Sequence, residues 1–300
     1  MRTSSTTVGF VGLGIIGTAL SSNLIEDGVA VVGFDLRQTQ LDAFEAAGGT
    51  PAGSPRDVAD RSDVVLTAVA TLGALEGLVS GPDGLAATTN RDVVVADLGT
   101  LPIEEKQRAR DILAGAGIPM LDCTISGTGA QAVVRDLTFM ASGDPAAVAV
   151  VSSVLAPLGR AVFDLGEFGN ALRMKLIANH LVGIHSLAAA EAMLIAERAG
   201  LDQHRVLEVI GASAGTSRMF EVRGPLIADR TYDVAQARVD MWVKDLILIT
   251  DFAQSVGAAT PLLDATMEVF QAANASSLGQ HDAAAVFEVL AARSGQAEGG

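Results

Sequence analysis

The sequence predicts an α/β fold in which a doubly wound, mostly parallel sheet is followed by an all-α C-terminal domain. Two observations carry this prediction. In the first half of the chain, short β-rich apolar runs alternate with helical stretches, as happens when helices cover both faces of a parallel sheet. After about residue 165 the strand signals largely stop, and an alanine-rich helical pattern follows. We therefore expect a first domain over residues 1–165 and a second over residues 166–300.

The elements predicted along the first domain follow in the order that such a sheet requires. Apolar runs rich in β-branched residues predict strands at 8–11, 29–34, 64–68, 93–97, 119–122, 138–141 and 161–164. Helices are expected on the faces of the sheet at 55–59 and 72–79. From about 170 to 199 the pattern predicts one helix about 45 Å long, at about 1.5 Å per residue. Its apolar residues lie on several faces, which is typical of a helix buried by its own domain and often by a partner subunit. A homodimer or homotetramer is therefore expected, although an all-α core could produce the same pattern.

Composition narrows the classes of function. The chain of 300 residues has 20 basic and 35 acidic side chains, a net charge of −15 and no Lys/Arg-rich run, which argues against a nucleic-acid partner. The most apolar long segment, 176–195, contains polar residues such as Asn179 and Glu191, and therefore indicates a buried helix rather than a membrane span. One cysteine, Cys123, excludes an internal disulfide, and with no signal-peptide pattern before the first strand a cytoplasmic location is expected.

The first strand leads directly into the glycine-rich turn Gly12-Leu13-Gly14-Ile15-Ile16-Gly17 and then into a helical pattern. In this context the spacing predicts a Rossmann-type dinucleotide-binding domain, although a glycine turn alone is weak evidence. Gly12 can make the tight turn, Gly14 leaves room for phosphate beside the backbone, and Gly17 lets the helix lie close to the sheet. The helix N-terminus, with Ile15 and Ile16 in its first turn, would then face the pyrophosphate.

The second predicted strand ends in Asp35, 21 positions after Gly14. A carboxylate at this distance can accept hydrogen bonds from the adenosine ribose and would repel a 2′-phosphate, so NAD is favoured over NADP. Arg37 leaves the choice open, because a guanidinium nearby can receive the phosphate. The alternative is that Asp35 merely ends a strand and that Arg37 is a solvated loop charge.

On the long predicted helix, Lys175 and Asn179 are spaced i, i+4 and therefore share one face. A cofactor that closed over this face would desolvate Lys175 and suit it to exchange a proton with a hydroxyl or carbonyl group. From spacing alone, an ordinary lysine on a helix surface is the more common interpretation.

Three stretches, GFVGLGIIGTAL, DVVLTAVA and VVVADLGTLP, resemble segments of the β-hydroxyacid dehydrogenase family, which includes 3-hydroxyisobutyrate dehydrogenase and tartronate semialdehyde reductase. The likeness runs across nearly the whole chain. The first stretch resembles the cofactor signature, and the second, which contains Val69, resembles the strand and loop that pass the dinucleotide. The third resembles the segment whose threonine, here Thr100, lies beside the nicotinamide ribose. Gly99 stands where the family usually has serine.

The segment DCTISGTGAQAVVRDLTFMASGD resembles the family's substrate loop, in which a Ser-Gly-Gly backbone holds a carboxylate. Here the motif reads Ser126-Gly127-Thr128, with Thr128 in place of a glycine and Thr124 in place of a proline. Backbone N–H groups and a hydroxyl suit an anionic group. The alternative is a glycine turn that only joins a strand to a helix.

The stretch GNALRMKLIANH is similar to the catalytic helix of the family. The resemblance implies that Lys175 is the general acid/base and that Asn179 orients the substrate. VKDLILITDFA resembles the family's Lys-Asp segment, which implies that Lys244 reaches cofactor and substrate while Asp245 secures its helix. The implied reaction is hydride transfer between NAD(P) and a small anionic hydroxy acid or aldehyde, in a cleft between the two domains.

Two other functions stay open. Relatives of this architecture reduce imines, but those enzymes commonly lack the lysine that stands here as Lys175. A non-catalytic dinucleotide-binding module would have little use for Lys175, Asn179 and Ser126 together. Within the favoured class, hydroxyisobutyrate, tartronate semialdehyde, threonate, succinic semialdehyde and a sulfonated aldehyde all fit an anion-binding loop and a lysine.

Four further residues each have a structural and a functional interpretation. His180 and His185 are five positions apart on the long helix and are interpreted as satisfied structural histidines, so no metal site is predicted. Trp242 either walls the substrate pocket or belongs to the core. Arg218 either binds the acid group of a substrate or is solvated.

Overall fold

The computed structural model describes residues 6–235 and 237–296 of the protein. The chain divides into two compact units, and the division falls after Lys175. This point lies inside the long helix α8 (Asn170–Arg198), whereas the sequence-based boundary at residue 165 follows strand β8 (Ala161–Asp164). The helix itself matches the prediction for 170–199.

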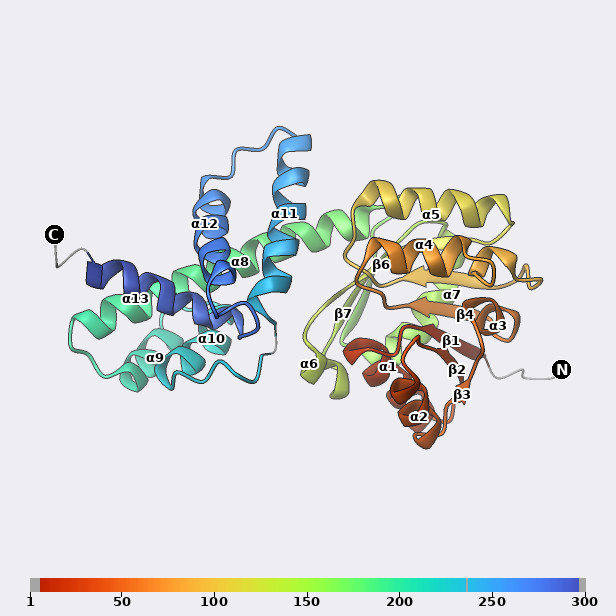
Figure 1. The fold of residues 1–300 in the computed structure, drawn as a ribbon, viewed down its shortest axis with the longest axis horizontal. Helices are drawn as coiled ribbons and strands as arrows, with labels where there is room; N and C mark the ends of the chain where they lie inside the picture. The colour runs from red at the N-terminus through yellow and green to blue at the C-terminus, as the bar shows by residue number, and fades with distance from the viewer. Residues whose placement is uncertain (1–5, 236, 297–300) are drawn as a thin grey trace. The chain divides into compact units, whose positions relative to one another are not determined.

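The first unit is built on one sheet with the strand order β3-β2-β1-β4-β5-β6-β7-β8 (Figure 1). Neighbouring strands are parallel except for β6 and β7, which are antiparallel. The strands before β8 are β1 (Thr7–Val11), β2 (Ala30–Phe34), β3 (Thr50–Pro51), β4 (Val64–Thr67), β5 (Val94–Asp97), β6 (Met120–Ser126) and β7 (Thr138–Ser142). The predicted doubly wound, mostly parallel sheet is confirmed.

Two strands differ from the sequence-based expectation. β6 continues to Ser126 rather than ending near Asp122, because its backbone goes on pairing with β7 as far as the Ser126–Thr138 pair. The short strand β3 was not predicted, since it has two residues and one of them, Pro51, cannot donate a backbone hydrogen bond. Both differences arise from pairing between strands, which local composition does not record.

Helices cover both faces of this sheet. Side chains of α3, α4 and α5 pack on one face, and those of α1, α2 and α7 pack on the other. The helices of the unit are α1 (Ile15–Glu26), α2 (Gln38–Ala46), α3 (Pro55–Asp60), α4 (Leu72–Ser80), α5 (Ile103–Gly115), α6 (Gly129–Val133) and α7 (Pro145–Leu155), with short 3-10 turns η1 (Leu85–Ala87) and η2 (Ala156–Leu158). Several begin at a capping side chain; the hydroxyls of Ser54 and Thr71, for example, accept the N–H groups that α3 and α4 leave unpaired.

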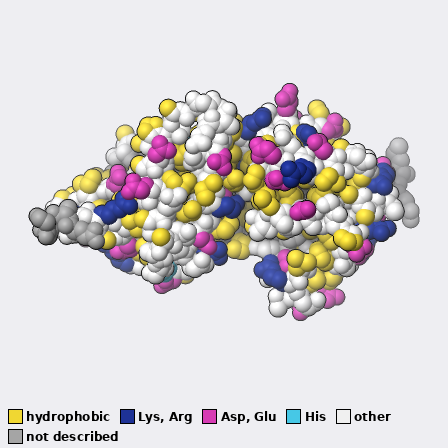
Figure 2. Space-filling view, turned by 45° about the horizontal axis from the view of Figure 1, so that its top comes forward, with side chains coloured by type: hydrophobic (Ala, Val, Ile, Leu, Met, Phe, Trp, Pro, Cys, Tyr) yellow, Lys and Arg dark blue, Asp and Glu magenta, His cyan; other side chains and the backbone are white. Residues whose placement is uncertain are grey.

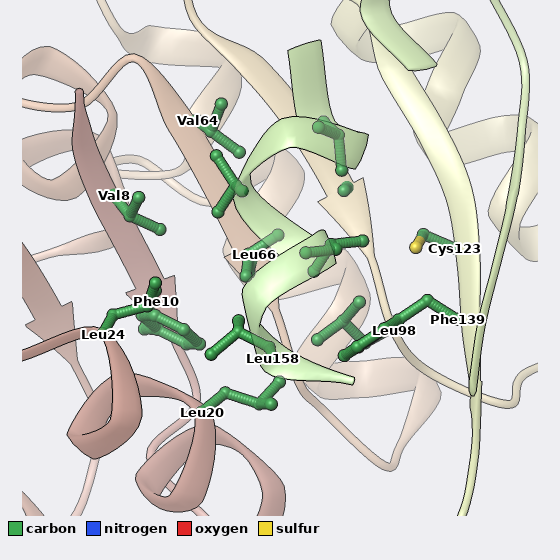
Figure 3. Close-up of a cluster of buried hydrophobic side chains, with 14 of the residues drawn as sticks. Val8, Phe10, Leu20, Leu24, Val64, Leu66, Leu98, Cys123, Phe139 and Leu158 are labelled. Atoms are coloured by element: carbon green, nitrogen blue, oxygen red, sulfur yellow. The ribbon is translucent and has the colours of Figure 1, made fainter. Parts of the chain in front are cut away.

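Alternate residues of β1, β2, β4, β5 and β6 enter opposite cores, as the pleat requires. Figure 3 shows one of the two cores, to which Phe10 and Leu66 of the sheet and Leu20 of α1 contribute. Cys123 is fully buried in the same core, and burial raises the pKa of its thiol to about 12. A thiol held in this state is not reactive.

The second unit is helical in all its described regular elements. It continues α8 and adds α9 (Gln203–Gly211), α10 (Arg218–Ala228), α11 (Val239–Ser255), α12 (Pro261–Ala275), the 3-10 turn η3 (Ala283–Ala285) and α13 (Val286–Gln296). In its core the rings of Trp242 on α11 and Phe270 on α12 lie 6.3 Å apart between centroids. Within residues 6–235 and 237–296, no helix is long and apolar enough to cross a membrane.

Candidate active site

The glycine-rich turn between β1 and α1 is shaped by two close backbone approaches. Gly12 has a φ of +97°, and a Cβ added there would lie 2.6 Å from the carbonyl oxygen of Ala68. A Cβ added to Gly17 would lie 2.0 Å from the carbonyl oxygen of Gly12. Gly17 therefore lets the first turn of α1 pack on the turn that precedes it, and both positions require glycine.

Gly14, in contrast, borders open space. A Cβ added to it would meet no atom within 4 Å, and Gly14 begins α1 with no side-chain cap. The first N–H groups of a helix have no partner within the helix, and their dipoles favour an anion. Ile15 and Ile16 belong to this first turn. An open, uncapped helix N-terminus beside a glycine fits the pyrophosphate of a dinucleotide.

Asp35 and Arg37 form one ion pair at the end of β2 rather than two separate charges. The Asp35 carboxylate accepts the N–H of Leu13 at 2.8 Å, and the Nε of Arg37 donates to it at 3.0 Å. Burial alone would raise the pKa of Asp35, but the hydrogen bonds from Arg37 and Leu13 outweigh it and lower this pKa below its usual value. The carboxylate is therefore charged at neutral pH and holds the glycine-rich turn in place. Arg37 itself is 58% exposed.

The loops that follow β4 and β5 pack against this turn. A Cβ added to Gly12 would lie 3.5 Å from Cγ1 of Val69, and a Cβ added to Gly99 would lie 2.9 Å from the carbonyl oxygen of Val69. Thr100 is the next residue along the β5 loop. The carboxyl ends of β1, β4 and β5 thus converge where the strand order of the sheet reverses, which is where doubly wound folds bind dinucleotides.

The predicted substrate segment lies beside the same turn. Ser126 ends β6 and Gly127 follows with a φ of +141°. Thr128 uses its backbone N–H and its hydroxyl in a capping box with Gln131 of α6, so it shapes the loop, and Ser126 and Gly127 are left as the candidate anion donors. A Cβ added to Gly129 would lie 2.3 Å from Cγ2 of Ile15, so α6 begins in direct contact with α1.

Lys175 lies in the second turn of α8, and the first turn of this helix is bound to the sheet. The hydroxyl of Thr124 on β6 donates to the carbonyl oxygen of Ala171 at 2.9 Å. The hydroxyl of Ser142 on β7 accepts the N–H of Ala171 at 3.0 Å. Thr124, which stands in place of a proline in the resemblance noted above, therefore contacts the helix that carries Lys175.

A buried ion cluster lies under the same edge of the sheet, and sequence reasoning missed it. The ammonium of Lys106 on α5 is fully buried, 3.0 Å from Oδ2 of Asp97 and 2.5 Å from Oδ1 of Asp122, and it donates to the carbonyl oxygen of Gly99 at 2.9 Å. Burial would lower the pKa of Lys106, but the two carboxylates raise it above its usual value, so the ammonium stays charged. In α5 the buried residues are Lys106, Ala109 and Leu113, and this i, i+3, i+7 spacing was the available signal that the lysine faces inward.

In the second unit, Asp245 joins two of the predicted site residues. Its Oδ2 accepts a hydrogen bond from the side-chain amide of Asn179 at 3.0 Å, and its Oδ1 lies 3.0 Å from the ammonium of Lys244. Asn179 is on α8 and the other two are on α11, so Asp245 ties the two helices together. The resemblance implied such a securing role for Asp245, and these contacts supply it.

The four residues with two interpretations are placed as follows. Trp242 is buried against Phe270, as the core interpretation predicts. Arg218 is exposed and paired with Glu221 in the next turn of α10, as expected of a solvated side chain. The interpretation of His180 as satisfied is wrong, because its Nδ1 is buried without a hydrogen-bond partner among the described residues, and the helix ladder already uses the nearby backbone groups. For His185 neither interpretation is tested.

On the face in Figure 2, basic and acidic side chains are interspersed. Within the described parts of the chain, no group of three or more His, Cys, Asp or Glu side chains is suited to hold a metal ion.

Both units match known family models. Residues 7–166 match the model described as the NAD binding domain of 6-phosphogluconate dehydrogenase. Residues 169–290 match the model described as NAD-binding of NADP-dependent 3-hydroxyisobutyrate dehydrogenase. The glycine-rich turn and its neighbouring loops lie in the first match, and α8 with Lys175 lies in the second.

Individual proteins match over almost the whole chain. L-threonate dehydrogenase of Cupriavidus necator is 36% identical over 287 residues, which are 95% of this chain and 96% of that protein. The cytokine-like nuclear factor N-PAC of Anopheles gambiae is 30% identical over 96% of this chain and 50% of its own length. A crystal structure of 3-hydroxyisobutyrate dehydrogenase from Salmonella typhimurium superposes with a TM-score of 0.85 at 30% identity, covering 95% of this chain and 99% of that one. The chain belongs to the β-hydroxyacid dehydrogenase family of NAD(P)-dependent oxidoreductases.

Proposed function

We propose that the protein transfers a hydride between the nicotinamide of NAD(P) and a small β-hydroxy acid or its semialdehyde, with Lys175 as the general acid/base. The observation that carries this proposal is the anchoring of the first turn of α8 by Thr124 and Ser142, in the same unit as the glycine-rich turn. When it is bound, the nicotinamide supplies the hydride acceptor or donor. The protein must supply the group that exchanges the proton and the groups that orient the substrate.

Each site residue has a role in this reaction. In oxidation the amine of Lys175 takes the proton of the substrate hydroxyl, and in reduction its ammonium gives that proton to the carbonyl oxygen. Asn179 lies one turn further along α8, and Asp245 holds its amide, so it is suited to orient the reacting oxygen. Ser126 and Gly127 bind the acid group of the substrate.

L-Threonate is the substrate that we propose to test first. The supporting observation is the 36% identity with a protein that bears the name L-threonate dehydrogenase. The other candidates are 3-hydroxyisobutyrate, tartronate semialdehyde, succinic semialdehyde and a sulfonated aldehyde. Initial rates of nicotinamide reduction or oxidation over this panel, with each cofactor in turn, will rank them.

NAD is the cofactor that we propose as preferred. Hydrogen bonds to its carboxylate lower the pKa of Asp35 and keep it charged, so it would repel an adenosine 2′-phosphate. Arg37 is the residue that opposes this preference, because its exposed guanidinium can turn toward a phosphate. Steady-state kinetics with NAD and NADP will measure the balance between the two groups.

Replacement of Lys175 tests the proposed chemistry. We expect Lys175→Ala to lower kcat by about 10²-fold to 10⁴-fold, the usual worth of a positioned proton-transfer group, while the Kd of the nicotinamide cofactor stays unchanged. Arg173→Ala is the matched control, since Arg173 is an exposed cation on the same helix whose side chain contacts Asn170. Undiminished turnover in Lys175→Ala would refute the assignment.

The two rival functions predict different outcomes in the same assays. An imine reductase would consume reduced nicotinamide with cyclic imines and not with the hydroxy acids or aldehydes, and the presence of Lys175 argues against this function. A non-catalytic module would bind cofactor and turn over nothing in either panel. The likeness to N-PAC, whose name is not that of an enzyme, is the reason to include this second outcome.

A further inference from the structure

One buried ammonium joins the two segments that the proposed reaction brings together. Lys106 donates to the carbonyl oxygen of Gly99, and Gly99 immediately precedes Thr100 on the β5 loop. The same ammonium pairs with Asp122, whose other carboxylate oxygen accepts the N–H of Leu172 at 2.8 Å in the first turn of α8. A single side chain thus connects the loop of Thr100 with the helix of Lys175.

Two neutral hydrogen bonds reinforce the helix side of this connection. Thr124 donates to the carbonyl oxygen of Ala171, and Ser142 accepts the N–H of Ala171. In an α-helix the N–H of residue 175 pairs with the carbonyl of residue 171. The peptide group that Thr124 holds is therefore the one on which the backbone of Lys175 is built.

The N-terminal turn of α8 contributes to the charge balance of the cluster. Asp97 and Asp122 bring two negative charges and Lys106 brings one positive charge, which leaves one negative charge in excess when all three are ionised. The N-terminus of a helix carries about half a positive elementary charge, and Asp122 contacts the N-terminal turn of α8 directly. The first turn of α8 is thus an electrostatic part of the cluster.

A cluster of this kind is costly to bury. Buried ion pairs are often no more stabilising than apolar side chains of the same volume, so fold stability alone does not account for the three charges. The charged groups add a defined geometry, because each of their hydrogen bonds fixes a distance and an angle between two segments.

We propose that the buried cluster of Lys106, Asp97 and Asp122, together with Thr124 and Ser142, positions the amine of Lys175 relative to the Thr100 loop. These five are positioning residues, since they act on the reaction through Lys175 and through the loop. The proposal rests on the proposed function of Lys175 as the general acid/base.

Thr124→Val is the sharpest test, because it removes one hydroxyl without changing volume or charge. Its matched control is Thr88→Val: both threonines are fully buried in the first unit, and the hydroxyl of Thr88 donates to Asp60 at 2.5 Å. We expect both variants to be destabilised to a similar degree in urea unfolding. Only Thr124→Val should lose kcat, by about 10-fold to 100-fold, because displacement of a catalytic group by about 1 Å has effects of this size.

The kinetic pattern separates positioning from general loosening of the fold. In Thr124→Val the pH profile of kcat should shift while the Kd of NAD or NADP stays that of the wild type, and Thr124→Ser should restore both. In a Lys175→Ala background, Thr124→Val should cause no further loss of turnover. If Thr124→Val does not fold, Ser142→Ala replaces it, since it removes the acceptor for the N–H of Ala171.

A spectroscopic measurement is independent of any substrate. The chain has three lysines, Lys106, Lys175 and Lys244, so reductive methylation with an isotope-labelled methyl group gives few NMR signals, and Lys175→Ala identifies that of Lys175. The titration midpoint of this signal should move in Thr124→Val and not in Thr88→Val.

The outcomes distinguish the proposed function of Lys175 from the positioning role of the cluster. Full turnover in Lys175→Ala would overturn the proposed function and this inference with it. If Lys175 proves essential while Thr124→Val loses no more activity than Thr88→Val and its methyl signal titrates as in the wild type, the positioning role alone is overturned.

Discussion

The described residues of each unit include a buried ion cluster, and the two clusters are bonded to different segments. In the first unit Lys106 contacts Asp97 and Asp122. In the second unit the guanidinium of Arg223 on α10 lies 2.5 Å from Oδ1 of Asp282, with both side chains buried. Asp282 also accepts the N–H of Ala284 at 3.0 Å, so this cluster joins α10 to the 3-10 turn η3.

The difference between the clusters lies in their neighbours. The contacts described for Arg223 and Asp282 reach the 3-10 turn η3 and Ala237, which precedes α11, and neither of these is a proposed site residue. The bonds of Lys106 and its partners end on Gly99 and Leu172, beside Thr100 and one turn before Lys175. Similar chemistry therefore supports the fold in one unit and, by our proposal, the alignment of reacting groups in the other.

The largest expected effect comes from breaking each cluster at its cation. Lys106→Met and Arg223→Met should each lower the free energy of unfolding by about 3–5 kcal/mol, because a buried carboxylate is left without its counter-charge. Urea unfolding will measure this loss. Activity per folded molecule, determined below the unfolding transition, should fall in Lys106→Met and stay unchanged in Arg223→Met.

An exposed pair provides the control for these two variants. Arg108 lies 2.7 Å from Glu105 on the surface of α5, and Arg108→Met should lower the stability by less than about 1 kcal/mol, since water screens such pairs. The comparison would break if Arg223→Met reduced activity per folded molecule as much as Lys106→Met does.

The sequence predicts those features of the fold that have a local signal and misses those that depend on contacts between distant segments. The β-branched runs located the main strands of the sheet, and the glycine spacing located the turn at Gly12 and Gly17, because both signals are local. The antiparallel pairing of β6 with β7 left no local signal, so the extension of β6 to Ser126 was missed.

The candidate site divides in the same way. Lys175, Asn179 and Ser126 were identified from short segments and a family resemblance. The contacts that hold them were not, because Thr124 meets Ala171 across 47 positions and Asp122 meets Leu172 across 50. Such contacts depend on the folded sheet, and no spacing rule within one element encodes them.

A third ion pair, Asp35 with Arg37, extends the comparison to the proposed cofactor site. Asp35 and Arg37 follow the end of β2, and by our proposal a bound cofactor would compete with their mutual contact. Asp35→Asn keeps an acceptor for the N–H of Leu13 and removes the charge. We expect it to change the ratio of kcat/KM for NAD to that for NADP by about tenfold in favour of NADP, the equivalent of about 1.4 kcal/mol.

Arg37→Ala completes this experiment. If the guanidinium receives the 2′-phosphate, the variant loses kcat/KM with NADP and keeps it with NAD. An unchanged NAD to NADP ratio in Asp35→Asn would show that the carboxylate serves only to hold the glycine-rich turn, as the buried clusters hold their own segments.

The smallest expected effect concerns a carboxylate that lies outside all three clusters. The hydroxyl of Thr88 and the N–H of Thr89 donate to Asp60 at 2.5 and 2.7 Å, and they lower the pKa of Asp60 below its usual value of 3.8 despite some burial. The unfolded chain therefore binds this proton first, so the stabilisation is present above about pH 4 and is lost as the pH falls through the folded-state pKa.

Asp60→Asn should accordingly be less stable than the wild type at neutral pH, by less than about 1 kcal/mol, and the difference should shrink toward zero as the pH falls below about 4. Urea midpoints over this pH range will measure it. Thr88→Val should reduce the same acid sensitivity, since it removes the main donor to Asp60. Neither change should alter kcat, because these side chains contact no proposed site residue. A loss of turnover in either variant would mean that catalysis responds to general stability. Activity could then no longer distinguish the roles of the two buried clusters.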